Sequence, residues 1–189
     1  MLGFLILLGL IVVVAFWVIG IYNALVRLRV QCDNAWSDID VQLKRRYDLI
    51  PNVVETVKGY ATHERKAFED VINARARAMA APGPAAKAEA ENILTGTLKT
   101  LFAVAEAYPQ LRAIESFTQL QKTLGEIEEF IQSARRYYNA VVRDLNTRIA
   151  VFPSNIIAGM FTFKPREFFE LAVPEERVAP KVSFESGKA

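Results

Sequence analysis

The chain has little of what enzymes and metal proteins most often need. Among its 189 residues there is one histidine, His63, and one cysteine, Cys32, so neither a two-histidine metal site nor an intramolecular disulfide can form. The nine glycines are scattered, and no strand precedes a glycine-rich loop, which excludes a dinucleotide fingerprint and a phosphate loop. We therefore expect no catalytic residues, no metal and no cofactor.

An excess of charge of either sign is also missing. The 23 basic and 21 acidic residues leave a net charge of +2, which is too weak a field to attract nucleic acid. The single cysteine is more typical of a reducing compartment than of a disulfide-stabilised exported domain. The sequence therefore predicts no nucleic-acid partner.

Charged side chains are absent altogether from residues 1–26, which are almost entirely apolar. As a helix this stretch would be about 39 Å long, more than the roughly 30 Å of bilayer hydrocarbon. A cleavable signal peptide, the alternative, has a basic first region and a shorter apolar run. We expect residues 1–27 to form a single transmembrane anchor.

Residues at the far end of this stretch are typical of a membrane interface. Trp17 and Tyr22 suit an aromatic belt, and Arg27 and Arg29 can extend their charges toward water. These arginines and the run Lys44–Arg46 follow the span, and no basic residue precedes it, which favours an N-terminus outside the cell and the remainder in the cytoplasm. An exported bundle is the alternative, because long domains cross membranes with little regard for their charge.

Residues 28–170 have the periodicity of packed helices. Between residues 112 and 150, apolar side chains recur alternately three and four apart, which predicts one long helix with a bundle-type seam. In this register Leu124 and Ile131 are buried, and Glu128 is exposed on another face.

Prolines and glycine divide the rest of this region. The segment Ala80–Pro84 separates one helix from the next, over residues 85–107, which ends at Tyr108–Pro109. Pro51 either breaks an earlier apolar stripe into two helices or only kinks one rod of about 75 Å, and we favour the break. The predicted fold is all-α: one N-terminal transmembrane helix followed by an antiparallel up-and-down four-helix bundle. Residues 171–189 lack a helical period and are expected to form a mobile tail.

Charged residues on the first and last bundle helices could pair with one another. Asp38 and Asp40 would face Arg135 and Arg136 in this arrangement. Arg45 belongs to a basic run about 25 Å from the membrane edge, which is too far for strong attraction to headgroups. We treat these five residues as a candidate inter-helix pairing or interaction face.

Several stretches of the chain resemble the LemA family. They are the apolar span, AWSDIDVQLKRRYDLIPNVVETVKGYATHE at residues 35–64, and ARRYYN at residues 134–139, and the resemblance extends through residues 108–113 and 152–153 to 168–169. It covers nearly the whole chain apart from the Ala/Pro linker and the tail. It implies a bacterial membrane protein with one span and a helical bundle, without established enzymatic activity and without catalytic residues.

Two functions fit these observations. The first is a non-enzymatic scaffold or interaction module at the bacterial inner membrane, which presents helix surfaces to other membrane or cytoplasmic proteins or to copies of itself. The alternative is binding of a lipid or small ligand, or a weak enzymatic activity, in a pocket between helices near Tyr137, Tyr138 and Asn139. A cavity with convergent polar groups favours the alternative, whereas a solid core with an exposed apolar patch favours the scaffold.

Overall fold

The computed structural model describes residues 1–170, which form helices and no strand. The helices are α1 (Leu2–Lys58), α2 (Arg65–Ala80), α3 (Gly83–Glu106), α4 (Pro109–Arg112), α5 (Glu115–Ala150) and α6 (Ser154–Met160). The predicted all-α class with a long apolar N-terminal helix is confirmed. The expected tail, residues 171–189, lies outside the described residues.

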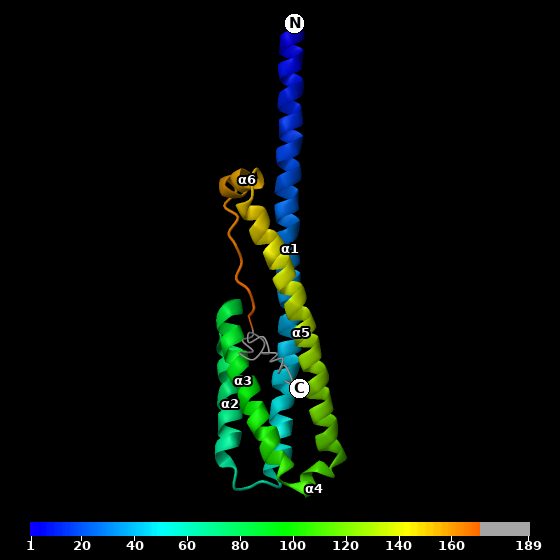
Figure 1. Cartoon of the computed structure of the whole chain (residues 1–189), viewed down its shortest axis with the longest axis vertical. Coiled ribbons are helices and arrows are strands. Elements are labelled where there is room, and N and C mark those ends of the chain that lie inside the picture. Colours follow the sequence, from blue (N-terminus) through cyan, green and yellow to red (C-terminus); the bar gives the residue numbers. More distant parts are fainter. Residues whose placement is uncertain (171–189) are drawn as a thin grey trace, which may run out of the picture.

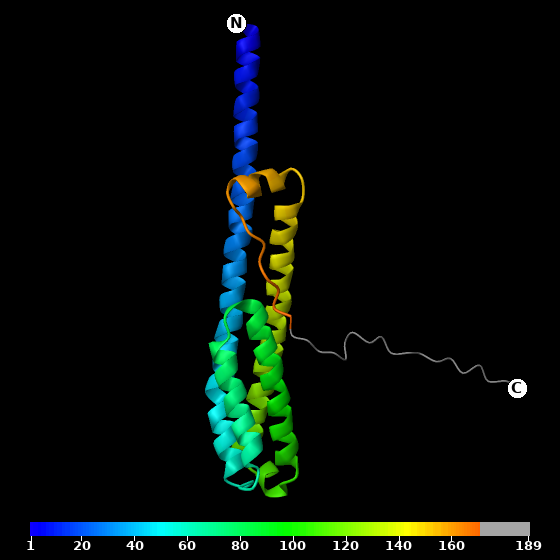
Figure 2. The same cartoon turned by 90° about the vertical axis from the view of Figure 1, so that its left-hand side faces the viewer.

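The helices form a long rod, and α1 runs through its full length (Figure 1). The chain passes down α1, up α2, down α3 and up α5, so neighbouring helices are antiparallel. The most extensive packing joins α1 to α5 and α2 to α3. At the end of the rod that holds the N-terminus, α1 and α5 extend beyond α2 and α3 as a two-helix stalk, which α6 caps (Figure 2).

The expected break at Pro51 is wrong, because α1 continues through this proline to Lys58 and the turn follows at residues 59–64. A proline in a helix cannot donate to the carbonyl four residues earlier, which here belongs to Tyr47. Nε of Arg75, on α2, donates to that carbonyl oxygen at 2.7 Å. A side chain from a neighbouring helix thus replaces the hydrogen bond that the proline removes.

The apolar seam of α5 faces inward as predicted. Leu124 is 7% exposed and Ile131 is fully buried. Glu128, expected on an exposed face, is instead partly covered, since 35% of its side chain is accessible and it forms an ion pair with Arg46 of α1. The spacing therefore gave the helix register correctly and did not reveal a polar contact across the bundle.

After α6 the chain returns along the stalk, held by side-chain amides. Nδ2 of Asn146 donates to the Arg166 carbonyl at 2.9 Å, and its Oδ1 accepts from the Arg166 N–H at 2.8 Å. Asn139 makes the same two contacts with Phe169, at 3.1 and 2.9 Å. Each amide supplies the donor and the acceptor that a neighbouring strand would offer. Phe169 is fully buried as a result, against the stalk.

Candidate membrane and interaction surfaces with a buried polar cluster

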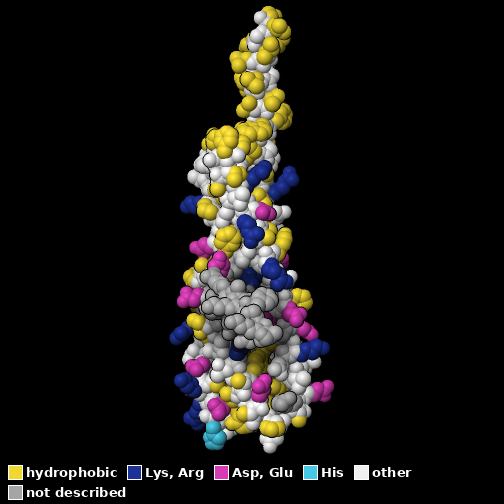
Figure 3. All heavy atoms as spheres, viewed as in Figure 1, with side chains coloured by type: hydrophobic (Ala, Val, Ile, Leu, Met, Phe, Trp, Pro, Cys, Tyr) yellow, Lys and Arg dark blue, Asp and Glu magenta, His cyan; other side chains and the backbone are white. Residues whose placement is uncertain are grey.

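The N-terminal third of α1 is a candidate membrane span. It contains a window of mean hydropathy 3.1, of which only 6% is buried, whereas a core helix of similar composition would be mostly covered. Trp17, near the end of this stretch, is 51% exposed. Figure 3 shows this part of α1 as a bare apolar column above the bundle. Such a surface needs a lipid or protein environment, because monomeric soluble proteins rarely expose large apolar patches.

The remaining predicted interface residues lie beside the α6 cap. Tyr22 is half-buried, and its ring centroid lies 4.7 Å from that of Phe161. The Arg29 guanidinium lies 5.3 Å from the centroid of the Phe163 ring, a cation–π distance. Arg27 is exposed. Their position beside the cap agrees with a membrane-interface role, which stays a prediction.

The candidate pairing face is at the surface. Asp38, Asp40, Arg45 and Arg136 are exposed, and Arg135 is half-buried. Pairing among these residues remains a hypothesis about register. Charged contacts that tie α1 to the rest of the chain include that of Asp33, whose Oδ1 lies 2.6 Å from Nη2 of Arg166.

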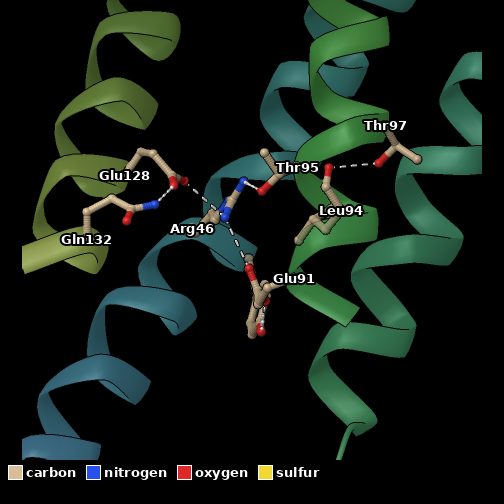
Figure 4. A network of polar contacts seen from close by, with 8 residues as sticks. Arg46, Glu91, Leu94, Thr95, Thr97, Glu128 and Gln132 are labelled. Carbon is tan, nitrogen blue, oxygen red and sulfur yellow. Dashed lines mark hydrogen bonds and ion pairs between the residues drawn. The ribbon is translucent and has the colours of Figure 1, made fainter. Parts of the chain in front are cut away.

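A polar cluster centred on Arg46 lies inside the bundle, and sequence reasoning missed it (Figure 4). The Arg46 side chain is 6% exposed, and its Nη1 lies 3.1 Å from Oε2 of Glu91 on α3. The same nitrogen lies 3.1 Å from Oε2 of Glu128 on α5. Nη2 donates to Oγ1 of Thr95 at 2.9 Å. One guanidinium therefore joins α1 to two other helices.

Glu91 is the most deeply buried carboxyl of this cluster, at 1% exposure. Its second oxygen accepts a hydrogen bond from the Tyr47 hydroxyl. Burial raises the pKa of Glu91, an effect that Arg46 and the Tyr47 hydrogen bond oppose. Burial and the neighbouring carboxylate raise the pKa of Tyr47 as well. Both oxygens of Glu91 are thus occupied by the chain's own donors, an arrangement suited to fixing helix register.

The two residues with the most reactive side chains are poorly placed for chemistry. His63 is exposed in the turn between α1 and α2. Cys32 is 1% exposed, and burial raises the pKa of its thiol, which disfavours the reactive thiolate. Within residues 1–170 no group of three or more His, Cys, Asp or Glu side chains is arranged to hold a metal ion.

The open grooves between helices include one on the membrane side and one at the distal end of α1. The membrane-side groove, of about 470 Å³, lies between α1 and α5 and is lined by Ala24, Arg27, Leu28, Gln31, Asp144, Thr147, Arg148 and Val151. The distal groove, of about 540 Å³, lies between α1 and α2 and is lined by Pro51, Val54, Glu55, Lys58, Arg65, Phe68, Glu69, Ile72 and Asn73. In the distal groove Val54 and Phe68 are buried, and the charged side chains are exposed.

Comparison with known proteins identifies the family to which these helices belong. A model of the LemA family matches residues 35–184, from the middle of α1 onward. The chain belongs to the LemA family. The resemblance expected from the sequence motifs is therefore confirmed for most of the chain.

Curated relatives of this LemA-family chain include proteins of magnetosomes. Magnetosome protein MamQ 2 of Paramagnetospirillum magneticum is 25% identical over 175 residues, which cover 79% of this chain and 64% of the relative. Magnetosome protein MamQ of Magnetospirillum gryphiswaldense is 24% identical, over 78% and 64% of the two chains. Protein LemA of Metamycoplasma hominis is 24% identical, over 74% and 64%. The match thus spans somewhat less than two thirds of each relative, and none of these names denotes an enzymatic activity.

Proposed function

We propose that this LemA-family protein is a non-enzymatic scaffold, anchored in a bacterial inner membrane by α1, whose bundle presents helix surfaces to other proteins or to copies of itself. The distal groove between α1 and α2 carries this proposal. It lies on the same continuous helix as the candidate span, about 50 Å from residue 20 at 1.5 Å per residue. Its apolar floor and charged rim are those of a groove that receives a partner helix.

The use of polar groups inside the chain supports a scaffold over an enzyme. Tyr138 and Asn139, which could have served an inter-helix ligand pocket, bind the backbone of residues 167 and 169 instead. The buried charges of Arg46 and Glu91 bind each other. The hydrogen bonds and ion pairs of these side chains are therefore already made within the fold. A substrate would have to break these contacts, at a cost in free energy.

Binding of a lipid or small ligand is the second candidate function. Both grooves fall within the roughly 300–1,000 Å³ typical of ligand sites. They are open to solvent, however, and therefore bury less of a small molecule than an enclosed cavity would. The distal groove accordingly suits a protein helix better.

Site-specific photocrosslinking in native membranes tests the scaffold proposal. A photoreactive residue at Ile72, which lines the distal groove and is 40% exposed, should give protein adducts of discrete mass. The same residue at Ile93, which is 45% exposed on α3, is the matched control. Replacing Glu69, an exposed residue of the same groove, with Arg should weaken the Ile72 adducts without placing a charge in the core. Equal adduct patterns at both positions would contradict a groove-specific partner, and adducts of lipid or small-molecule mass would favour the second candidate.

We also propose that the bundle lies in the cytoplasm. Arg27, Arg29, Lys44 and Arg45 follow the candidate span, and basic residues near a span favour the cytoplasmic side. Reporters that are active in only one compartment, fused after residue 189, test this orientation. Activity of the exported reporter alone would contradict it.

A further inference from the structure

The α6 cap exposes a concentrated apolar surface. We use the term apolar cap for Phe152, Ile156, Met160 and Phe161, which are 78, 54, 71 and 50% exposed. On the opposite face of α6, Ile157 and Ala158 are buried against the stalk. The helix therefore packs with one face, and within residues 1–170 its more apolar face stays largely exposed.

The position of the apolar cap relative to the candidate span indicates what covers it. Tyr22 packs on Phe161, so the cap lies beside α1 at the level where exposed apolar residues end and buried ones begin, at Ile21. The 19 residues of α1 before that point are about 28 Å long, close to the hydrocarbon thickness of a bilayer. The bilayer surface would thus meet the chain at α6.

The shape of this region agrees with contact with a lipid surface. α6 lies across the end of the stalk, not along it (Figure 2). Hydrophobic side chains gather over α6 and continue directly into the bare column of α1, with basic side chains below them (Figure 3). α6 has no charged residue of its own, and the cationic side chains beneath it, such as Arg27 and Arg148, belong to α1 and α5. An apolar surface above a band of basic residues is the arrangement found where a protein meets a membrane interface.

Charged residues of the membrane-side groove lie where lipid phosphates would be. Arg27 and Arg148 are exposed, and Thr147 and Gln31 add hydrogen-bonding groups. Asp144 also lines this groove and offsets one of the two positive charges. The groove is adjacent to the apolar cap, because Val151 borders it and precedes Phe152.

We propose that the apolar cap inserts into the same bilayer that α1 crosses, as a second membrane contact, with Arg27 and Arg148 at the depth of the lipid phosphates. The insertion is favourable because it removes apolar side chains from water. It also holds the bundle upright, since α1 and α6 then meet the membrane side by side. The proposal rests on α1 spanning the membrane.

Depth-dependent fluorescence quenching of the full chain in phosphatidylcholine–phosphatidylglycerol liposomes tests the insertion. Single cysteines in a Cys32→Ala background carry an environment-sensitive dye at Phe152 or Met160. Val12, within the span, is the lipid reference, and Val41, which is 50% exposed on α1 within the bundle, is the water reference. We expect lipids with brominated acyl chains to quench the dye at Phe152 and Met160 several-fold more than at Val41, and aqueous iodide to do the reverse.

The references separate the possible failures. If bromolipids quench the dye at Val12 but leave Phe152 and Met160 like Val41, the insertion is refuted and the span stands. If they do not quench at Val12, the span itself is refuted, and with it the anchoring in the proposed function. If the dyes at Phe152 and Met160 are shielded from both quenchers, and more so at high protein-to-lipid ratio, a second copy of the chain covers the apolar cap and the insertion is wrong.

Discussion

Replacing Arg46 with methionine removes the positive charge that compensates Glu91 most strongly, at 3.1 Å from its carboxylate. Glu91 is 1% exposed, on a neighbouring helix. Methionine has a similar length and keeps the apolar contacts of the arginine stem. The buried carboxyl then retains the hydrogen bond from Tyr47 and the weaker attraction of Lys87. Breaking a buried ion pair by removing one partner destabilises by about 3 to 5 kcal/mol, because the other charge is left uncompensated.

The loss can be measured as a shift in the midpoint of thermal unfolding, Tm, followed by circular dichroism on the full chain in mild detergent. A change of 1 kcal/mol shifts Tm by roughly 2–4 °C in a chain of this size, so Arg46→Met should lower Tm by roughly 6–20 °C. The matched control is Arg45→Met, since Arg45 is exposed and its loss should change stability by about 0.5 kcal/mol or less. Glu128→Gln should cost about 1 kcal/mol or less, because water reaches the 35% exposed side chain.

The double variant Arg46→Met with Glu91→Gln distinguishes an uncompensated charge from lost packing. It contains no buried charge at this pair, and the glutamine oxygen can still accept the Tyr47 hydrogen bond. We therefore expect it to be more stable than Arg46→Met alone. Additive losses from the two substitutions, or an Arg46→Met variant no less stable than Arg45→Met, would refute the reasoning.

Three further predictions use the same unfolding measurement. Ile131→Ala should destabilise by about 2 to 5 kcal/mol through lost burial and a cavity, whereas Phe130→Ala, at a 59% exposed position, should change stability little; equal losses would contradict the α5 register. The pKa of Glu91 is raised in the native chain, so above pH 4.5 the native chain keeps the Glu91 proton while the unfolded chain releases it. The stability of the native chain should therefore fall relative to that of Glu91→Gln as pH rises from 4.5 through the native pKa. A stability difference that does not change with pH would refute the shift. Arg75→Met should destabilise the chain by about 1 to 3 kcal/mol, because the Tyr47 carbonyl loses its donor. The loss should be smaller in a Pro51→Ala background, where the backbone N–H of residue 51 can donate to that carbonyl. Equal losses in both backgrounds would argue against the compensation of proline by Arg75.

The helical elements could be predicted from the sequence wherever the evidence is local. The three-and-four spacing through Leu124 and Ile131 fixes which face of α5 is buried, because a helix repeats every 3.6 residues. The end of α1 could not be placed in this way. Pro51 removes one hydrogen bond locally, but whether a helix tolerates that loss depends on Arg75, 24 residues further along the chain and on another helix.

The polar cluster was detectable in part. Arg46 lies three residues after Leu43 and four before Ile50, both fully buried, so the helical period places this charge on the inner face of α1. Glu91 likewise lies three residues before the buried Leu94. A charge at a buried position of a helix indicates a partner of opposite sign, because an unpaired buried charge is too costly. The sequence could not indicate which of the many acidic residues is the partner of Arg46, since that depends on how the helices cross.

The continuity of α1 links the membrane end of the molecule to the distal groove. With no break between the candidate span and Lys58, a rotation of the span about its axis turns the groove with it. The span alone would leave this rotation free in a fluid bilayer. An apolar cap inserted on one side of α1 would couple the rotation to the tilt of the bundle. The groove would then stay at a fixed height of about 50 Å above the membrane surface. A partner helix for this groove has to come from a soluble protein on the same side of the membrane or from a membrane protein that itself extends about as far. Membrane proteins with short loops are therefore poor candidates for the crosslinked species.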